Sequence, residues 1–217
     1  MHPNVLLIGI GGGSGSGKSA LAKRIQEAAG DERVAVIELD TYYRDFSHLP
    51  KSERERLNYD HPDALDWDAI LDDLSALRDG EAVELPVYDF TTHERRDEVI
   101  EVYPTPAVIV EGIHCLVHEP LRELLDIRIF VDTDADVRFI RRLRRDILDR
   151  DRSIDGVVAQ YMATVRPMHN DYVEPGRRHA DIIVPESTGQ NQLGIELLVE
   201  AIVGRIDRFV AECAELA

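Results

Sequence analysis

The chain has 217 residues, 44% of them hydrophobic, which suits one compact domain with its own core. Its 42 acidic and 25 basic residues give a net charge of −17, which argues against nucleic-acid or anionic-membrane binding, because both need a basic face. No apolar run reaches membrane-spanning length, and the start "MHPNVLLIGIGGG" lacks the basic region and cleavage site of a signal peptide.

Short apolar runs alternate with amphipathic runs along most of the chain. The apolar runs predict buried strands at residues 4–10, 33–39, 106–112, 126–132 and 180–185. Apolar residues at helical spacing predict helices at residues 18–29, 66–79, 135–150, about 155–169 and 191–213. Because such alternation is typical of parallel sheets, we expect an α/β fold with a mainly parallel five-stranded sheet flanked by helices, in one domain of residues 1–217.

The middle of the chain departs from this alternation. Residues 41–66 have no clear period and predict a loop with short helical turns. Residues 83–87 and 98–102 each alternate between apolar and polar side chains, with about ten polar residues between them. This pattern predicts a solvent-facing antiparallel β-ribbon, inserted over the sheet at about residues 82–104.

The stretch "GGSGSGKS" satisfies every position of the phosphate-binding pattern G-x-x-x-x-G-K-[ST], between a predicted strand and a predicted helix. Glycines let the backbone wrap a phosphate closely, and the helix N-terminus adds positive potential. We therefore expect a P-loop NTPase-type fold, with Lys18 on the β- and γ-phosphates and Ser19 on Mg²⁺. The residues expected to bind the nucleotide phosphates are Gly12, Gly13, Ser14, Gly15, Ser16, Gly17, Lys18, Ser19 and Ala20. The chain lacks the N-K-x-D motif of GTPases, so a GTPase is not expected.

Two acids stand at the carboxyl ends of predicted strands, where open parallel sheets bind their ligands. Asp40 is the best candidate to deprotonate an attacking hydroxyl, although its position fits the cap of a helix starting at Thr41 equally well. Glu111 is placed to contact Mg²⁺ directly or through water, like a Walker B acid. The alternative for Glu111 is an acid that faces solvent; the phosphate loop favours the metal role.

Residues 138–152 carry seven arginines and three aspartates, a net charge of +4 in an acidic chain. Arg138, Arg142 and Arg145 are spaced to share one helical face. One interpretation is a lid, about residues 138–160, that brings positive charge to the transferred phosphate. The other is a surface helix whose arginines pair with Asp146 and Asp149. The nearby phosphate loop favours the lid.

Together the motifs resemble the uridine kinase (uridine–cytidine kinase) family of P-loop kinases. The matching stretches, in order, are "GGSGSGKS", "LDTYYRD", "NYDHPDALDWD", "YDFTTHERR", "VIVEG", "VDTDADVRFIRRLRRD", "QYMATVRPMHNDYVEP" and "ADIIVPE". They extend over most of the chain, and several are far more specific than a phosphate loop. The resemblance implies Mg²⁺-dependent transfer of the γ-phosphoryl group of ATP to the 5′-hydroxyl of uridine or cytidine.

The resemblance also implies a role for each matching residue. Catalytic roles fall to Asp40, Lys18, Arg145 and Arg150, nucleoside contacts to Asp60, Tyr88, Phe90, His93, Arg142, Arg152 and Gln160, and Mg²⁺ contacts to Ser19, Asp40 and Glu111. These roles suit the chemistry of the residue types. A carboxylate at Asp60 can accept two ribose hydroxyl protons, and a tyrosine and a histidine can meet the edge of a pyrimidine.

Three parts of the sequence depart from the family pattern. Asp151, in "DRDR", stands where the family often has glycine between the last two lid arginines. His114 and Cys115 replace aliphatic residues, and His114 is expected to pack and not to catalyse. The stretch "PESTGQN", expected near the adenine, differs from the family's shorter loop, which leaves ATP or GTP open as donor.

Two other functions remain open from the sequence: a P-loop kinase for another small hydroxyl acceptor, such as a sugar phosphate or pantothenate, and a non-catalytic nucleotide-binding regulator. We expect a small-molecule partner, with no nucleic acid or membrane. The resemblance implies a homo-oligomer, often a tetramer. The two cysteines, Cys115 and Cys213, match no metal-ligand spacing, so a reduced, cytoplasmic protein is expected.

Overall fold

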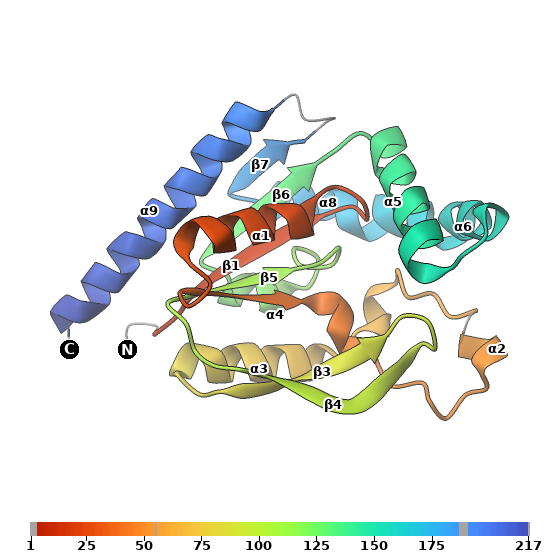
Figure 1. Ribbon diagram of the computed structural model, residues 1–217, viewed down its shortest axis with the longest axis horizontal. Coiled ribbons are helices and arrows are strands. Elements are labelled where there is room, and N and C mark those ends of the chain that lie inside the picture. The colour runs from red at the N-terminus through yellow and green to blue at the C-terminus, as the bar shows by residue number, and fades with distance from the viewer. Residues whose placement is uncertain (1–3, 55, 187–190, 217) are drawn as a thin grey trace.

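A five-stranded parallel sheet forms the centre of the molecule (Figure 1). The computed structural model describes residues 4–54, 56–186 and 191–216. The strands are β1 (Leu6–Gly12), β2 (Val34–Glu38), β5 (Ala107–Glu111), β6 (Ile127–Asp132) and β7 (Ile182–Pro185). They lie in the order β2-β5-β1-β6-β7, and each neighbouring pair is parallel. The predicted α/β architecture and its five strands are confirmed, although the edge strand β7 is only partly buried, with Ile183 exposed.

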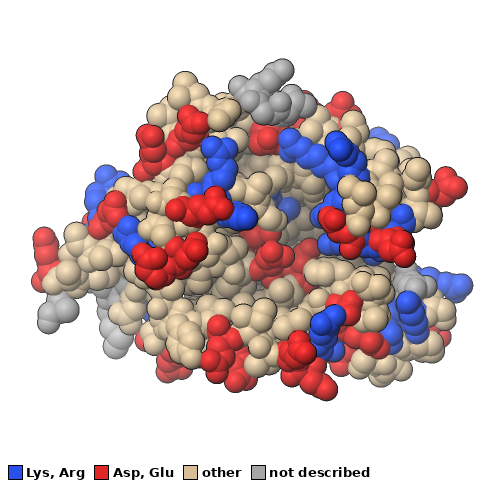
Figure 2. All heavy atoms as spheres, viewed as in Figure 1, with Lys and Arg blue, Asp and Glu red and all other residues tan. Residues whose placement is uncertain are grey.

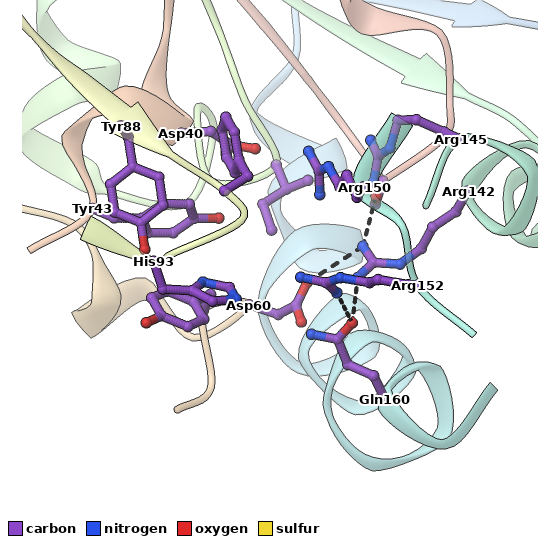
Figure 3. A pocket seen from close by; sticks show the side chains of 14 residues that line it. Asp40, Tyr43, Asp60, Tyr88, His93, Arg142, Arg145, Arg150, Arg152 and Gln160 are labelled. Carbon is purple, nitrogen blue, oxygen red and sulfur yellow. Dashed lines mark hydrogen bonds and ion pairs between the residues drawn. The ribbon is translucent and has the colours of Figure 1, made fainter. Parts of the chain in front are cut away.

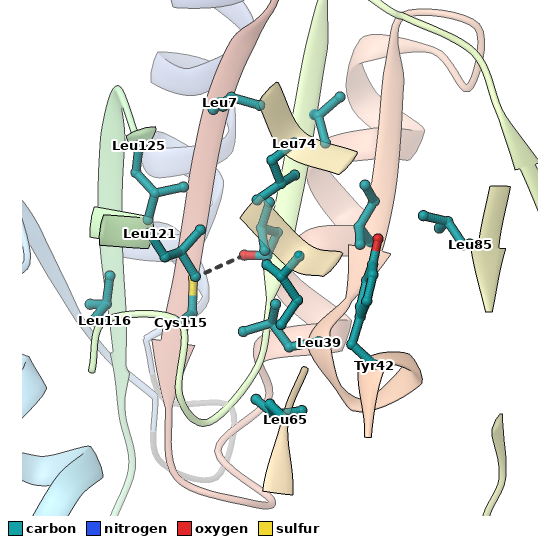
Figure 4. Close-up of a cluster of buried hydrophobic side chains, with 14 of the residues drawn as sticks. Leu7, Leu39, Tyr42, Leu65, Leu74, Leu85, Cys115, Leu116, Leu121 and Leu125 are labelled. Atoms are coloured by element: carbon teal, nitrogen blue, oxygen red, sulfur yellow. Dashed lines mark hydrogen bonds between the residues drawn. The ribbon is translucent and has the colours of Figure 1, made fainter. Parts of the chain in front are cut away.

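Helices cover both faces of this sheet. Alternate residues of β1 point to opposite faces, so that Ile8 and Ile10 pack towards α1 (Lys18–Ala29) and α9 (Gln192–Leu216). Leu7 packs on the other face, which α3 (Trp67–Asp79) and α4 (Glu119–Leu124) cover, in the cluster drawn in Figure 4. The sequence did not predict α4, because six residues carry too little periodicity to stand out. None of the described helices is long and apolar enough to cross a membrane.

An antiparallel ribbon of β3 (Val83–Asp89) and β4 (Glu94–Val102) runs beside α3. The ribbon was predicted, but its strands are longer than expected and only four residues separate them. The reason is that polar residues at the tip also pair between the strands, as Asp89 does with Glu94. The ribbon is also not solvent-facing throughout, because Leu85 and Tyr88 are buried against the core below the sheet.

A helical region lies across the right-hand end of the molecule in Figure 1. It consists of α5 (Ala135–Arg150), α6 (Ile154–Gln160), α7 (Arg166–Met168) and α8 (Glu174–Gly176). π-helical turns at Tyr161–Val165 and His169–Val173 join the last three into one helix, which extends past the predicted end near residue 169. Each π-helical turn precedes a short helix with proline near its start, and proline has no N–H for the regular ladder.

The connection between β2 and α3 contains only short helical pieces, as predicted. A 3₁₀ turn at Leu39–Tyr42, the short helix α2 (Lys51–Arg54) and a second 3₁₀ turn at Pro62–Ala64 occupy it. Because all five sheet strands are parallel, the ends of β1, β2 and β5 lie at the same edge. This edge faces the ribbon tip and the helices α5 and α6, and the candidate site lies between them.

Candidate active site

The phosphate loop lies between the end of β1 and the start of α1, as its sequence pattern predicts. Its glycines are required at two places. Gly15 has a φ of +80°, and a Cβ there would collide with the backbone carbonyl of Arg138. Gly12 has a φ of +140°, and its Cβ would lie 2.6 Å from the carbonyl oxygen of Val131. Only glycine can adopt these backbone angles at such close approach.

Arg138 and Thr133 fix the phosphate loop from behind. The Thr133 hydroxyl donates to the carbonyl of Ser16 at 2.9 Å, and the Arg138 Nε donates to the carbonyl of Thr133 at 2.9 Å. The Arg138 guanidinium lies against Gly13 and 3.0 Å from His169 Nε2. Burial and the nearby Arg138 charge lower the pKa of His169 to about 4, which keeps its ring neutral at pH 7.

The spacing had placed Arg138 on one helical face with Arg142 and Arg145. In the structure Arg138 is not among the residues that line the cleft beside the phosphate loop, which is described below. The first turn of α5 follows β6 directly and so lies against the phosphate loop, whereas the cleft is reached one turn later. Arg138 therefore has a structural place under the loop.

Lys18, Ser19 and Glu111 lie together where α1 begins and β5 ends. The Ser19 hydroxyl donates to Glu111 Oε1 at 2.5 Å, and Lys18 Nζ donates to the carbonyl of Gly13 at 3.3 Å. Burial raises the pKa of Glu111, and the neighbouring Lys18 and Ser19 oppose that rise. A hydroxyl and a carboxylate oxygen therefore converge beside the loop, and both are ligand types that Mg²⁺ prefers.

Glu38 joins this group of acids, although the sequence analysis did not single it out. It is the last residue of β2 and pairs in register with Glu111. Burial, followed by repulsion from Glu111 and Asp40, raises the pKa of Glu38. In residues 4–54, 56–186 and 191–216, no group of three or more His, Cys, Asp or Glu is arranged to hold a metal ion. Mg²⁺ commonly needs only one or two carboxylates, because substrate phosphates and water complete its shell.

A cleft opens beside the phosphate loop and is lined by residues of the loop, the ribbon tip and the helices α5 and α6. Figure 2 shows it as a hollow with acidic side chains inside and basic side chains along its upper right rim. Its lining residues are Ser14, Asp40, Tyr43, Tyr59, Asp60, Tyr88, Phe90, His93, Ile113, Arg142, Arg145, Arg150, Arg152 and Gln160. The structure thus brings every residue predicted to contact the acceptor, together with Asp40, to one cleft.

Asp40 lies inside the 3₁₀ turn Leu39–Tyr42, directly after β2. Glu38 occupies the N-cap position of this turn, and the Thr41 hydroxyl donates to the carbonyl of Glu38 at 2.9 Å. The alternative in which Asp40 caps a helix starting at Thr41 is therefore wrong. Its carboxylate lines the cleft on the side of the phosphate loop.

An aromatic wall forms the side of the cleft shown on the left of Figure 3. Tyr43 and Tyr88 lie 5.1 Å apart between ring centroids, and Tyr88 meets Phe90 edge to face at 5.3 Å. His93 stacks on Tyr59 at 4.7 Å, with 15° between the ring planes. No role was predicted for Tyr59. It precedes Asp60 in a loop whose residues show no periodicity that would indicate which side chains face inward.

The ribbon tip is built to present His93. Its φ of +56° turns the chain back towards β4, and its N–H donates to the carbonyl of Asp89 at 2.8 Å. The Asp89 carboxylate accepts from the N–H groups of Thr91 and Thr92 at 2.8 and 3.3 Å. The Arg54 Nε supports the tip from below, donating to the carbonyl of Thr92 at 3.2 Å.

Asp60 is a buried acid at the centre of the cleft, with 7% of its surface exposed. Its Oδ2 accepts from the Thr164 hydroxyl at 3.0 Å, and its Oδ1 lies 3.9 Å from Arg142 Nη1. Burial raises the pKa of Asp60, while Arg142 and Thr164 oppose the rise. Thr164 was not predicted, although it lies in the matching stretch "QYMATVRPMHNDYVEP", because it stands 104 residues from Asp60 in the chain and nothing local shows that the two side chains meet.

The helical region brings four arginines to the opposite side of the cleft, as Figure 3 shows. Gln160 Oε1 accepts from Arg142 at 3.1 Å and from Arg152 at 2.6 Å. Arg142 also donates to the Ser14 hydroxyl at 2.9 Å, which connects the phosphate loop to the helical side of the cleft. The guanidinium of Arg150 lies 4.6 Å from the centroid of the Phe90 ring, across the cleft.

Asp151 explains why a glycine suits this position in the family. It follows the last residue of α5 with a φ of +51° and a ψ of 38°, which is left-handed backbone. Its N–H donates to the carbonyl of Asp146, a typical helix C-terminus. The side chain is exposed, and no ion pair between described residues involves it.

Replacing Asp151 with glycine is expected to raise the free energy of unfolding by up to about 1 kcal/mol, because glycine adopts left-handed backbone without steric cost. Chemical denaturation of both proteins measures the difference. The matched control is Asp149→Gly, one residue inside the helical end, which should lower stability because glycine is a poorer helix former. A less stable Asp151→Gly protein would contradict the interpretation of the turn.

The remaining departures from the family pattern have a structural place or lie outside the described residues. His114 is buried, and burial lowers the pKa of its ring to about 3, so it packs as a neutral side chain, as expected. Cys115 is also buried, and its thiol lies 3.3 Å from the carbonyl of Val110 (Figure 4). Most of the stretch "PESTGQN", residues 187–190, lies outside the described residues.

Comparison with known proteins agrees with this geometry. Residues 7–192 match the family model described as "Phosphoribulokinase / Uridine kinase family". The uridine kinase of Geobacillus sp. (strain WCH70) is 51% identical over 93% of this chain and 95% of its own length. The uridine kinase of Chloroflexus aggregans is 50% identical over 93% and 96%.

Solved structures show the same fold at low sequence identity. A putative fructose transport system kinase from Silicibacter sp. TM1040 superposes with a TM-score of 0.68 at 23% identity, covering 85% of this chain and 91% of its own. The phosphoribulokinase of Rhodobacter spheroides has a TM-score of 0.62 at 16% identity, covering 85% and 71%. The chain therefore belongs to the phosphoribulokinase/uridine kinase family of P-loop kinases.

Proposed function

We propose that the protein transfers the γ-phosphoryl group of ATP to the 5′-hydroxyl of uridine, cytidine or both, giving the nucleoside monophosphate. The observation that carries this proposal is the cleft itself. Two carboxylates, Asp40 and Asp60, line one cleft together with Ser14 of the phosphate loop and an aromatic wall. Both compared relatives of about 50% identity are uridine kinases.

The acceptor nucleoside would lie between the aromatic wall and the lid. Asp60 would accept hydrogen bonds from the ribose hydroxyls, while Gln160 holds Arg142 and Arg152 beside it. Tyr88, Phe90 and His93 would meet the pyrimidine on the side of the ribbon tip. In this arrangement the 5′-hydroxyl would point towards Asp40 and the phosphate loop.

Asp40 would orient the 5′-hydroxyl and take its proton as the phosphoryl group transfers. Lys18 would reach the β- and γ-phosphates, and Arg145 and Arg150 would stabilise the charge on the transferred group. Ser19 and Glu111, with Asp40 nearby, would hold Mg²⁺, which would supply positive charge to the phosphates. The backbone N–H groups from Gly12 to Ala20 would bind the phosphates.

A separate pocket supports a purine nucleotide, such as ATP, as donor. It lies on the outer side of the phosphate loop and is lined by Gly17, Ala20, Leu21, Arg24, Val131, Arg141, Glu186 and Ile195. Its surface is largely apolar, which suits a purine ring. Arg141 and Glu186 form a two-contact ion pair at its edge. ATP against GTP is decided by measuring initial rates with each donor.

A phosphorylated acceptor is the second candidate, and the state of the ribbon arginines disfavours it. Arg95 donates to the carbonyl of Tyr43 at 2.8 Å and pairs with Asp66 at 3.3 Å. Arg96 pairs with Asp89 at 2.8 Å. Neither lines the cleft, so neither is placed to bind an acceptor phosphate.

The test is an initial-rate assay of the purified protein with ATP, Mg²⁺ and a panel of acceptors. Uridine and cytidine should form 5′-monophosphates, and a sugar phosphate and pantothenate should not react. Turnover with neither nucleoside would overturn the proposal. ATP binding without turnover of any acceptor would instead support a nucleotide-binding regulator. Omitting Mg²⁺ should abolish the reaction.

His93 should determine base preference. We expect His93→Asn to change the ratio of kcat/KM for uridine over cytidine by about tenfold, the value of one hydrogen bond, and to leave the KM for ATP unchanged. Asparagine also tolerates left-handed backbone, so the ribbon turn is kept. His48→Asn, on the exposed surface of the adjoining loop, is the matched control. A fall in ATP affinity without a change in base preference would remove the ribbon from this role.

We further propose that the chain is a single kinase domain in which the ribbon, about residues 82–104, and the lid, about residues 138–160, are parts of one unit. A single cooperative unfolding transition would support this, and separate transitions would contradict it. The homo-oligomer implied by the family resemblance is tested by light scattering of the purified protein.

A further inference from the structure

Asp146 is a fully buried acid that the proposed reaction does not use. It lies in the third turn of α5, with 0% of its surface exposed, and it does not line the acceptor cleft. An isolated carboxylate is costly to bury, so its surroundings must compensate the charge. The compensation comes from the lid arginines.

The four arginines that line the cleft all lie within 4.0 Å of the Asp146 carboxylate. They are Arg142, Arg145, Arg150 and Arg152, called the lid arginines below. Arg145 donates from Nε and Nη2 to Oδ1 at 3.0 and 2.9 Å. Arg142 Nε lies 3.5 Å from Oδ2. Arg150 Nη1 lies 3.7 Å from Oδ1, and Arg152 Nη1 lies 4.0 Å from Oδ2.

The same residue also fixes the backbone that returns the chain to the cleft. The carbonyl of Asp146 accepts the N–H of Asp151 and, at 3.1 Å, the N–H of Arg152. Two of the four arginines, Arg150 and Arg152, flank this turn. The carbonyl and the carboxylate of one residue therefore hold both the chain and the guanidinium groups.

Four guanidinium groups so close together repel one another, and Arg142 is itself buried, with 7% of its side chain exposed. Asp146, which does not line the cleft, contacts all four guanidinium groups from behind. From inside the cleft, Asp60 lies near Arg142, and Gln160 accepts from Arg142 and Arg152. A ligand that displaces contacts inside the cleft would leave the Asp146 contacts in place. The arginines would then be positioned before the substrate arrives, which is the condition for strong electrostatic catalysis.

We infer that Asp146 is the positioning residue of the lid, a buried carboxylate that holds the four arginines in the arrangement needed for phosphoryl transfer. It touches neither substrate, so its effect is carried entirely by the arginines. The inference goes beyond the proposed function, on which its kinetic readout rests.

The kinetic test is Asp146→Asn, which keeps the side-chain shape and removes its charge. Arginines facing the transferred phosphate act mainly in the transition state, so kcat should fall by about 10²-fold. The KM for ATP should change much less than kcat, because Thr133 and Arg138 hold the phosphate loop independently of Asp146, although Arg142 also contacts Ser14. Asp149→Asn, an exposed aspartate in the same helix with the same charge change, should retain full activity. Equal activity of the two variants would overturn the inference.

A second readout needs neither activity nor a stable Asp146 variant. In the protein labelled with ¹⁵N-arginine, the Nε–H of Arg145 should give a slowly exchanging NMR signal, because it is bound to Asp146. Arg145→Lys identifies this signal by removing it. Absence of any such signal in the unmodified protein would overturn the inference. If uridine and cytidine are not phosphorylated, the proposed function fails, and the spectrum alone decides the role of Asp146.

Discussion

Replacing Asp40 with asparagine is expected to lower kcat by about 10²–10⁴-fold, the typical contribution of a general base. The KM for the nucleoside should change little, because the proposed contacts to the ribose and base are made by other residues of the cleft. Asparagine fits the same 3₁₀ turn between Leu39 and Tyr42, so the fold around the site should not change. Steady-state kinetics with saturating ATP and varied uridine separates kcat from KM.

The acids around Asp40 shape this expectation. Its carboxylate raises the pKa of Glu38 and of Glu111, although burial is the larger cause in both. Three acids thus share one strand edge with Lys18, and bound Mg²⁺ would add further positive charge. As general base, Asp40 would take up a proton in a site where the carboxyl groups of Glu38 and Glu111 lie close to it.

The matched control is Asp45→Asn, which removes a carboxylate from the same loop outside the cleft. Its kcat should equal that of the unmodified protein. If Asp40→Asn also retains its kcat, Asp40 is not the general base. If Asp40→Asn raises KM and leaves kcat unchanged, the residue only binds the acceptor.

Replacing Asp60 with asparagine is expected to lower discrimination between uridine and 2′-deoxyuridine by roughly 10²-fold. A hydrogen bond to a charged group is worth about 1.5–3 kcal/mol, and deoxyuridine lacks the hydroxyl that would make this bond. The loss should therefore fall on uridine, with a smaller effect on the deoxynucleoside. The ratio of kcat/KM for the two nucleosides, measured in one preparation, reports the change.

The pH dependence of uridine binding should report the same residue. Burial raises the pKa of Asp60 above that of an ordinary aspartate. The ribose contact needs the ionised form, which is present above this raised pKa. Uridine affinity should accordingly fall as the pH decreases through the raised pKa, and Asp60→Asn should lose this dependence.

Asp63→Asn is the control for both measurements, since the Asp63 side chain is 90% exposed and lies three residues further along the same loop. It should leave discrimination and pH dependence unchanged. An equal loss for uridine and 2′-deoxyuridine in Asp60→Asn would show that Asp60 supports the site without contacting the 2′-hydroxyl.

Local patterns were enough to predict most of the fold. The strands and the helix Ala135–Arg150 were predicted because apolar period and turn residues act over a few neighbours. The phosphate loop was predicted for the same reason, since its glycine spacing, strand and helix are contiguous. The π-helical continuation past residue 169 was not predicted, because Pro175 would ordinarily end or kink a helix. The length of the ribbon was not, because the residues that pair at its tip are polar and show no apolar alternation.

The candidate site was predicted as a set of residue types, and only part of its geometry followed. Spacing placed Arg138 with the lid arginines, but its position against Gly13 and Gly15 depends on how α5 leaves the sheet. Tyr59 and Thr164 lie in matching stretches, but nothing local distinguished them from their neighbours, because they belong to the site through contacts with His93 and Asp60.

The sequence by itself determined the strand and helix order, the phosphate loop and the residue types of the acceptor site, because these are encoded in short contiguous segments. The tertiary structure decided which charged groups meet and which are buried. Ser19 reaches Glu111 across 92 residues, and Asp60 reaches Thr164 across 104. Asp146 was only one of two aspartates offered as surface partners, and burial among four arginines distinguishes it. Burial and charge pairing depend on distances between elements, which periodicity within an element does not contain.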